Sequence, residues 1–101
     1  MFDDRSVQPD EFKVEQNYPN PFNGMTKINY FINSSGNISI QLYDILGEEI
    51  FVKDLGYHLP GSYSYLLDSK LLTSNSLTSG VYFYVFKGTN KQEARKFVLL
   101  N

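Results

Sequence analysis

Few side chains in this chain of 101 residues could take part in catalysis or bind a transition metal. The sequence contains one histidine, His58, and no cysteine. A zinc site needs about four nitrogen, sulfur or oxygen ligands, and no spacing of residues here supplies them. His58 lies among glycines and a proline, so we expect an ordinary surface residue rather than a metal ligand or a pH switch.

Hydroxyl and carboxylate side chains are more numerous, but their patterns do not indicate an active site. No nucleophile elbow or acid–base arrangement surrounds any serine or threonine. The adjacent carboxylates of Glu48 and Glu49 follow a turn, as solvated charges do. Asp44, Asp54 and Asp68 could offer oxygen ligands to calcium, although no twelve-residue calcium loop is present. We therefore predict a non-enzymatic domain that needs no cofactor.

Aromatic residues are the other chemical feature of the sequence, which contains 8 tyrosines and 8 phenylalanines. Tyr82, Tyr84 and Phe86 fall on one face of a predicted strand. If exposed, they could stack on sugar rings, and if buried, they would contribute a large apolar area to a core. We favour the core, because the run Val81–Phe86 is apolar on both faces, which is typical of a central strand.

The composition argues against several classes of function. The net charge is -2, and without a basic patch for phosphates we expect no nucleic-acid binding. No run of about 18 apolar residues is present, so no transmembrane segment is predicted. Residues 1–10 are polar and acidic, which is typical of a linker from an upstream domain. Residues 11–101 then form one domain.

Alternating apolar residues predict short strands along most of the chain. The predicted strands lie near residues 12–14, 28–32, 38–42, 50–52, 63–67, 81–86 and 92–100. A brief helical turn is predicted at residues 69–72. Turn signals recur roughly every 8–12 residues, as in an all-β sandwich, and this is the predicted fold class.

The segment Gln16–Asn23 is the most constrained loop. Each of its two prolines fixes its own φ and pushes the preceding residue towards extended geometry. Asparagine side chains can bond nearby backbone groups. We expect the loop to lock neighbouring elements together, with Tyr18 and Phe22 inserted into the core. The residues that we expect to build this motif are Asn17, Pro19, Asn20, Pro21, Phe22 and Asn23.

Two further loops are predicted from turn residues. Asp44 opens a tight hairpin connection in which Gly47 supplies a positive φ. The segment Leu55–Gly61 contains several strand breakers and is predicted to be a loop. Gly80 directly precedes the aromatic strand and marks its start.

These segments together resemble the type A C-terminal sorting domain of bacterial type IX secretion cargo. This domain is related to the immunoglobulin-like domain of flagellar hook-capping proteins. The likeness runs from about residue 9 to residue 101, in the family's order and spacing. The stretches that carry it are Phe12–Asn23, Thr26–Tyr30, Leu42–Ile50, Ser79–Tyr84 and Arg95–Asn101.

The resemblance implies an immunoglobulin-like β-sandwich of about seven antiparallel strands at the C-terminus of a larger secreted protein. Such a domain directs its upstream cargo domain across the outer membrane through the type IX secretion system. The protein would then be secreted or held at the cell surface, via the periplasm. The implied partners are the outer-membrane translocon and the sorting peptidase of that machinery.

In this family the last strand and its tail carry much of the sorting signal. The matching residues here are Lys96, Val98, Leu99 and Leu100. An exposed terminal strand could bind a receptor by strand addition, or it could only complete the sandwich. Two other functions fit the same fold, namely a carbohydrate-binding module and an immunoglobulin-like spacer attached to a secreted enzyme. The fold alone does not choose among them.

Overall fold

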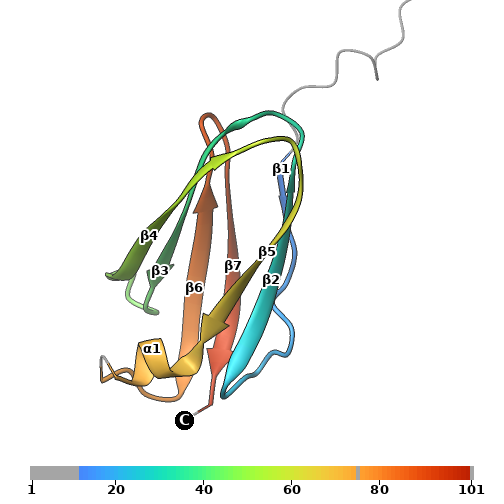
Figure 1. Cartoon of the computed structure of the whole chain (residues 1–101). Coiled ribbons are helices and arrows are strands. Elements are labelled where there is room, and N and C mark those ends of the chain that lie inside the picture. The colour runs from blue at the N-terminus through green and yellow to red at the C-terminus, as the bar shows by residue number, and fades with distance from the viewer. Residues whose placement is uncertain (1–11, 75, 101) are drawn as a thin grey trace, which may run out of the picture.

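The alternation of apolar and polar residues produces strands along most of the chain (Figure 1). The computed structural model describes residues 12–74 and 76–100, and the predicted linker at residues 1–10 lies outside them. The elements within the described residues are β1 (Phe12–Val14), β2 (Met25–Ile32), β3 (Gly36–Tyr43), β4 (Glu49–His58), β5 (Gly61–Asp68), α1 (Ser69–Thr73), β6 (Gly80–Lys87) and β7 (Gln92–Leu99).

The strands form two antiparallel sheets that face each other (Figure 1). One sheet has the order β1-β2-β5 and the other the order β4-β3-β6-β7. The predicted seven-stranded all-β sandwich is therefore confirmed. The predicted helical turn is α1, and the Asp68 side chain caps it by accepting a hydrogen bond from the Lys70 N–H at 2.9 Å.

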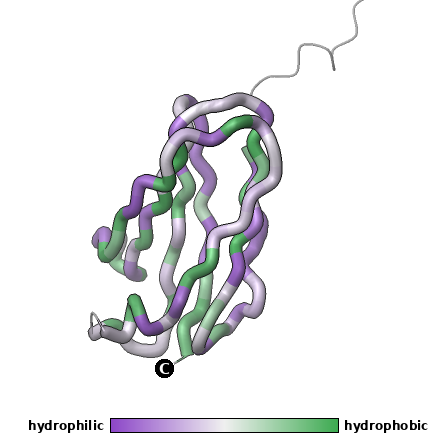
Figure 2. Tube along the Cα trace, viewed as in Figure 1, coloured by the Kyte–Doolittle hydropathy of each residue, from purple (hydrophilic) through white to green (hydrophobic). Residues whose placement is uncertain are grey.

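Apolar side chains from both sheets fill the space between them. Figure 2 shows hydrophobic and hydrophilic positions alternating along the strands, as expected when one face of each sheet is buried. Tyr84 and Phe86 are fully buried and Tyr82 nearly so. The prediction that these aromatics belong to the core is confirmed, and a sugar-stacking platform on this strand is wrong. The other buried hydrophobic residues are Val14, Phe22, Ile28, Tyr30, Ile32, Ile38, Ile40, Leu42, Leu67, Leu72, Phe97 and Leu99.

Strand β4 is longer than predicted, because it continues through most of the expected loop Leu55–Gly61 to His58. Gly56 has a φ of 91° and lies at a shift of register in the pairing between β3 and β4. The Asp54 carboxylate accepts a hydrogen bond from the Gly56 N–H at 2.9 Å. Glycine thus forms a bulge inside the strand instead of ending it.

The extension of β4 also overturns the prediction for His58, which is only 8% exposed. Its Nε2 lies 2.6 Å from the Tyr30 hydroxyl, and its Nδ1 lies 3.0 Å from the Gly56 carbonyl oxygen. The ring centroid of His58 is 4.4 Å from that of Tyr63. Because Tyr30 belongs to β2, this hydrogen bond joins the two sheets. The histidine is part of the packed interior and not of the surface.

The connection between β3 and β4 is a tight turn organised by Asp44. Its carboxylate accepts hydrogen bonds from the N–H groups of Leu46 and Glu48, each at 2.9 Å. The Asp44 carbonyl also accepts a bond from the Gly47 N–H at 2.9 Å. Gly47 has a φ of 87°, a left-handed conformation that a side chain disfavours. The turn therefore depends on both residue types.

We expect Gly47→Ala to lower the free energy of unfolding by about 1–2 kcal/mol, since a Cβ is strained at this φ. The added methyl group would meet no atom within 4 Å, so the loss would come from the backbone conformation alone. Gly88→Ala is the matched control, because Gly88 has no positive φ and a Cβ there would make only ordinary contacts. Urea denaturation of both variants checks this, and equal losses would contradict it.

Candidate functional site

Strand β7 carries the residues that the resemblance assigns to the sorting signal, and its side chains alternate between two environments. Leu99 is fully buried, and its neighbour Phe97 is fully buried as well. Lys96 is exposed, Val98 is half-buried and Leu100, just after the strand, is 48% exposed. Three of the four candidate residues are therefore accessible from outside the folded domain, whereas Leu99 belongs to the core.

One edge of β7 pairs with β6 along its whole length. The antiparallel register runs from Gly80 opposite Leu99 to Lys87 opposite Gln92. Gly80 therefore begins β6 directly beside the end of the candidate signal. This pairing makes the last strand an integral part of the four-stranded sheet.

The other edge of β7 is covered by residues 16–22, which we call the clamp. Phe22 forms a parallel bridge with Leu99. The Phe22 N–H donates to the Val98 carbonyl at 3.1 Å, and the Leu100 N–H donates to the Phe22 carbonyl at 2.9 Å. The Asn20 side chain accepts from the Val98 N–H at 2.8 Å, and the Gln16 side chain donates to the Lys96 carbonyl at 2.7 Å.

Side chains near the start of β7 bond to the backbone of strand β1. The Glu93 carboxylate accepts a hydrogen bond from the Val14 N–H at 2.9 Å. The Arg95 Nε donates to the Val14 carbonyl at 2.7 Å. On the edge of β7 away from β6, the Lys96 carbonyl, both backbone groups of Val98 and the Leu100 N–H are thus already bonded within the domain. Of the two alternatives left open by the sequence, these bonds favour a strand that completes the sandwich over one with a free edge for strand addition.

Buried anchors hold the clamp in place. The Phe22 side chain is 2% exposed, and its ring centroid lies 5.8 Å from that of Phe97 in β7. Asn17 is also buried, and its side-chain amide donates to the Thr26 hydroxyl at 3.0 Å and to the Pro19 carbonyl at 3.2 Å. The clamp therefore has one apolar and one polar attachment to the body of the domain.

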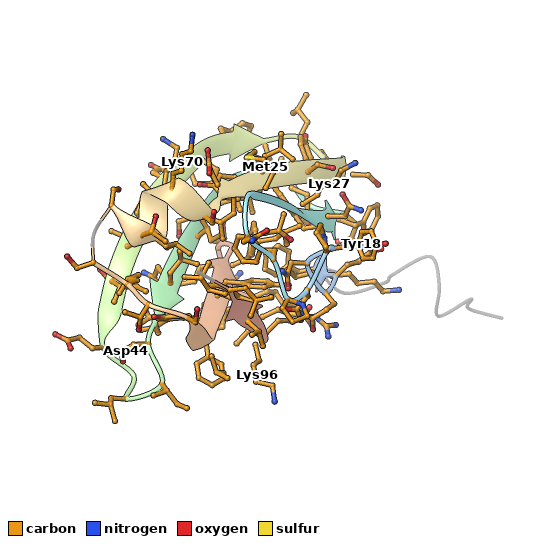
Figure 3. All side chains as sticks on the ribbon, turned by 90° about the horizontal axis from the view of Figure 1, so that it is seen from below. Tyr18, Met25, Lys27, Asp44, Lys70 and Lys96 are labelled. Atoms are coloured by element: carbon orange, nitrogen blue, oxygen red, sulfur yellow. The ribbon has the colours of Figure 1, made fainter. Side chains whose placement is uncertain are left out.

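The remaining predicted members of the proline motif lie at the surface. Pro19, Pro21 and Asn23 are exposed, and both X–Pro peptide bonds are cis. The predicted insertion of Tyr18 into the core is wrong, because Tyr18 is 81% exposed. Its backbone pairs with Lys27, and paired residues of antiparallel strands point to the same face. That face is the outside of the three-stranded sheet, and Figure 3 shows Tyr18 at the periphery of the molecule.

The Tyr84 hydroxyl is a third anchor of the clamp, and the sequence analysis missed it. It donates to the Glu15 carbonyl at 2.7 Å and accepts from the Asn17 N–H at 3.0 Å. Burial raises the pKa of Tyr84 to about 12, although the Asn17 N–H and the Arg95 charge act in the opposite direction. The aromatic sequence Tyr82–Phe86 gives no sign that the Tyr84 hydroxyl forms hydrogen bonds with the backbone of Glu15 and Asn17.

The carboxylates considered as calcium ligands accept hydrogen bonds from backbone N–H groups. The carboxylates of Asp44, Asp54 and Asp68 each accept a hydrogen bond from an N–H group two residues further on. Within residues 12–74 and 76–100, no three histidine or acidic residues gather as a metal site would require. In the same part of the chain, no helix is long and apolar enough to cross a membrane.

We expect Phe22→Ala to lower the free energy of unfolding by about 3–5 kcal/mol, because it removes a buried ring and leaves a cavity. Tyr18→Ala, in the same loop, should change stability by no more than about 0.5 kcal/mol, since that side chain is exposed. Chemical denaturation of both variants measures the difference. A small effect of Phe22→Ala would show that the ring does not anchor the clamp.

Stability should fall at alkaline pH because of the buried tyrosines. Burial, together with the charge of Tyr63, raises the pKa of Tyr30 to about 12, and the pKa of Tyr84 is raised to the same value. A folded state with the higher pKa holds the proton more tightly than the unfolded state. The resulting stability is fully present below about pH 10 and is lost as the pH rises towards 12.

The test of this pH dependence is denaturation at several values from neutral pH to about pH 11. Tyr84→Phe should be less stable than the parent at neutral pH, because the hydrogen bonds of the hydroxyl are lost. Its further decline at alkaline pH should nevertheless be smaller, because one titrating group is gone. An unchanged alkaline slope would argue against this assignment to Tyr84.

Comparisons with known proteins place the chain in a family. No curated protein matches its sequence. Its structure is similar to that of dimeric latent PorU from Porphyromonas gingivalis, with a TM-score of 0.64 and 19% sequence identity. The match covers 92% of this chain but only 10% of the PorU chain. A β-glucosidase from Erythrobacter marinus matches with a TM-score of 0.48, 11% identity and coverage of 90% of this chain and 16% of that chain.

The family model described as the secretion system C-terminal sorting domain matches residues 16–100. This range includes the clamp, the Asp44 turn and all of β7. Members of this family are not catalysts. The chain therefore belongs to the family of secretion system C-terminal sorting domains, which act as sorting signals for type IX secretion.

Proposed function

We propose that the sorting signal of this domain is a folded surface, formed by the outward side chains of β7 and its end. The single observation that supports this most is the alternation along β7. Lys96, Val98 and Leu100 point outwards while Phe97 and Leu99 enter the core. A receptor can read the three outward side chains without unfolding the domain.

The hydrogen bonds of the clamp favour recognition through side chains over recognition through strand addition. Strand addition needs free N–H and C=O groups along an edge. On β7 the Lys96 carbonyl, both backbone groups of Val98 and the Leu100 N–H are already bonded to the clamp. An added strand would have to displace the clamp and its buried Phe22 ring, so the lower-cost mode leaves the clamp in place.

We propose that the outer-membrane translocon and the sorting peptidase of the type IX machinery are the partners that read this surface. The cargo is a domain upstream of the linker at residues 1–10, and it reaches the medium or the cell surface via the periplasm. The chain itself has no enzymatic role in this scheme, and any catalysis belongs to the cargo. The family match supports these assignments. No observation favours a carbohydrate-binding or spacer role.

The test is a fusion of the complete chain to the C-terminus of an exported reporter, in a bacterium with type IX secretion. Leu100→Ser should lower the secreted fraction about tenfold, which corresponds to ~1.4 kcal/mol of lost binding free energy. Its melting temperature should stay near that of the parent, because the Leu100 side chain is exposed.

Leu59→Ser is the matched control, because Leu59 is an exposed leucine (64%) located between β4 and β5. It should secrete like the parent fusion. Equal secretion of the Leu100 variant and the parent would count against a signal at the end of β7. Failure of the parent fusion to leave the cell would count against the sorting function of the chain as a whole.

A further inference from the structure

The outward side chains of β7 continue into an apolar surface on the same side of the four-stranded sheet. The register places Lys96 opposite Phe83 and Phe83 opposite Tyr43, in one row across three strands. The neighbouring row lies two residues closer to the end of β7, and in it Val98 lies opposite Val81. Phe83, Tyr43 and both valines are half-buried.

The next row reaches the far edge of the sheet. Ala94 lies opposite Val85, Val85 opposite Gln41, and Gln41 opposite Val52. Val52 is 52% exposed. Apolar side chains thus lie next to one another on β6 and β7, and Gln41 separates them from Val52 at the far edge. Single exposed apolar residues are more usual on a soluble domain.

Charge on this face has one sign over three of the four strands. The outward residues of β3, β6 and β7 include two charged side chains, Lys87 and Lys96, and no carboxylate. The cross-strand neighbours of Lys96 and Lys87 on this face are Phe83, Ser39 and Gln92. Carboxylates occur on the fourth strand, where Glu49 and Asp54 lie opposite Tyr43 and Ser39. The apolar residues of β6 and β7, together with Lys87 and Lys96, are complementary to an apolar surface that carries acidic groups.

The turn organised by Asp44 adds a fixed apolar projection beside this face. Ile45 and Leu46 are 67% and 88% exposed, although the Asp44 carboxylate holds the turn in one conformation. Figure 3 shows Asp44 and Lys96 along one side of the molecule, and Met25, Lys27 and Lys70 along the opposite side. A rigid turn orders few additional side chains on binding, which lowers the entropic cost of docking.

The outer face of the other sheet has a different character. The outward residues of β5 are Ser62, Ser64, Leu66 and Asp68. The Ser64 hydroxyl donates to the Asn29 side chain of β2 at 2.6 Å. The apolar residues of that face each lie opposite a polar one, since Met25 pairs with Asp68, Leu66 with Lys27 and Phe31 with Ser62. The face therefore provides matched residues for control experiments.

We infer that the outer face of β3, β6 and β7, centred on Phe83 and Lys96, is the docking surface for an acidic, apolar surface of the secretion machinery. This inference rests on the proposed function and extends the recognised region from the end of β7 to the middle of the sheet. Phe83 provides the apolar centre, and Lys96 pairs with a carboxylate of the partner. Val98 links this centre to Leu100.

The test uses the reporter fusion with Phe83→Ser and Lys96→Glu, and each variant has a control on the opposite sheet. Phe31→Ser matches the first, because Phe31 is a half-buried aromatic on the outer face of β2, and Lys27→Glu matches the second. Phe83→Ser and Lys96→Glu should each lower the secreted fraction about tenfold or more, a change equivalent to ~1.4 kcal/mol of binding free energy. The two controls and Lys96→Arg should secrete like the parent.

Melting temperatures of the purified domains separate a loss of recognition from a loss of folding. Lys96 is exposed, so reversal of its charge in Lys96→Glu should leave the fold intact. If both test variants were secreted normally while secretion of Leu100→Ser was still blocked, the inference of a docking face would be refuted. The proposed signal at the end of β7 would not be affected. If Lys96→Glu and Lys96→Arg lowered the secreted fraction equally, the inference that Lys96 pairs with an acidic group of the partner would be refuted.

Sedimentation of the parent and of Phe83→Ser tests whether the domain self-associates. A dimer that Phe83→Ser dissociates without loss of secretion would make this face a contact between two copies, and would also refute the inference.

Discussion

Hydrogen bonds from residues 16–22 cover the edge of β7 that lies away from β6. A strand at the edge of a sheet leaves backbone donors and acceptors unpaired along one side, and such an edge can pair with other chains. Here the segment that includes Gln16, Asn20 and Phe22 bonds to those groups between Lys96 and Leu100. The first and last parts of the described chain therefore stabilise each other, and the sandwich is closed at the side where β1 and β7 meet.

This closure determines which parts of the strand can take part in recognition. The backbone of β7 is engaged on both sides, by β6 and by the clamp. Its inward side chains hold the core through Phe97 and Leu99. Only the outward side chains remain, and they lie beside the apolar residues of β6 and β3. The sorting signal that we propose on this strand is a patch of a folded surface rather than a linear peptide, although its residues are close in sequence.

Much of the architecture was predictable, because strand alternation and turn chemistry are local. The Asp44 turn follows from a carboxylate that caps nearby N–H groups and from a glycine with a positive φ. The predictions for Tyr18 and His58 were wrong because residues distant in sequence determine where these side chains lie. Tyr18 faces solvent because its backbone pairs with Lys27. His58 is buried because β4 extends past the bulge at Gly56 and brings the ring to Tyr30.

The sequence by itself determined the fold class, the approximate positions of the strands and the family, because these depend on periodicity and on short motifs in a fixed order. The contacts of the proline motif and the accessibility of Lys96, Val98, Leu99 and Leu100 depend on the tertiary structure. The contacts that join Gln16 and Asn20 to β7 link residues about 80 positions apart, and no local pattern specifies such pairs. The same holds for the row from Lys96 to Tyr43, which exists because three strands are aligned in one register.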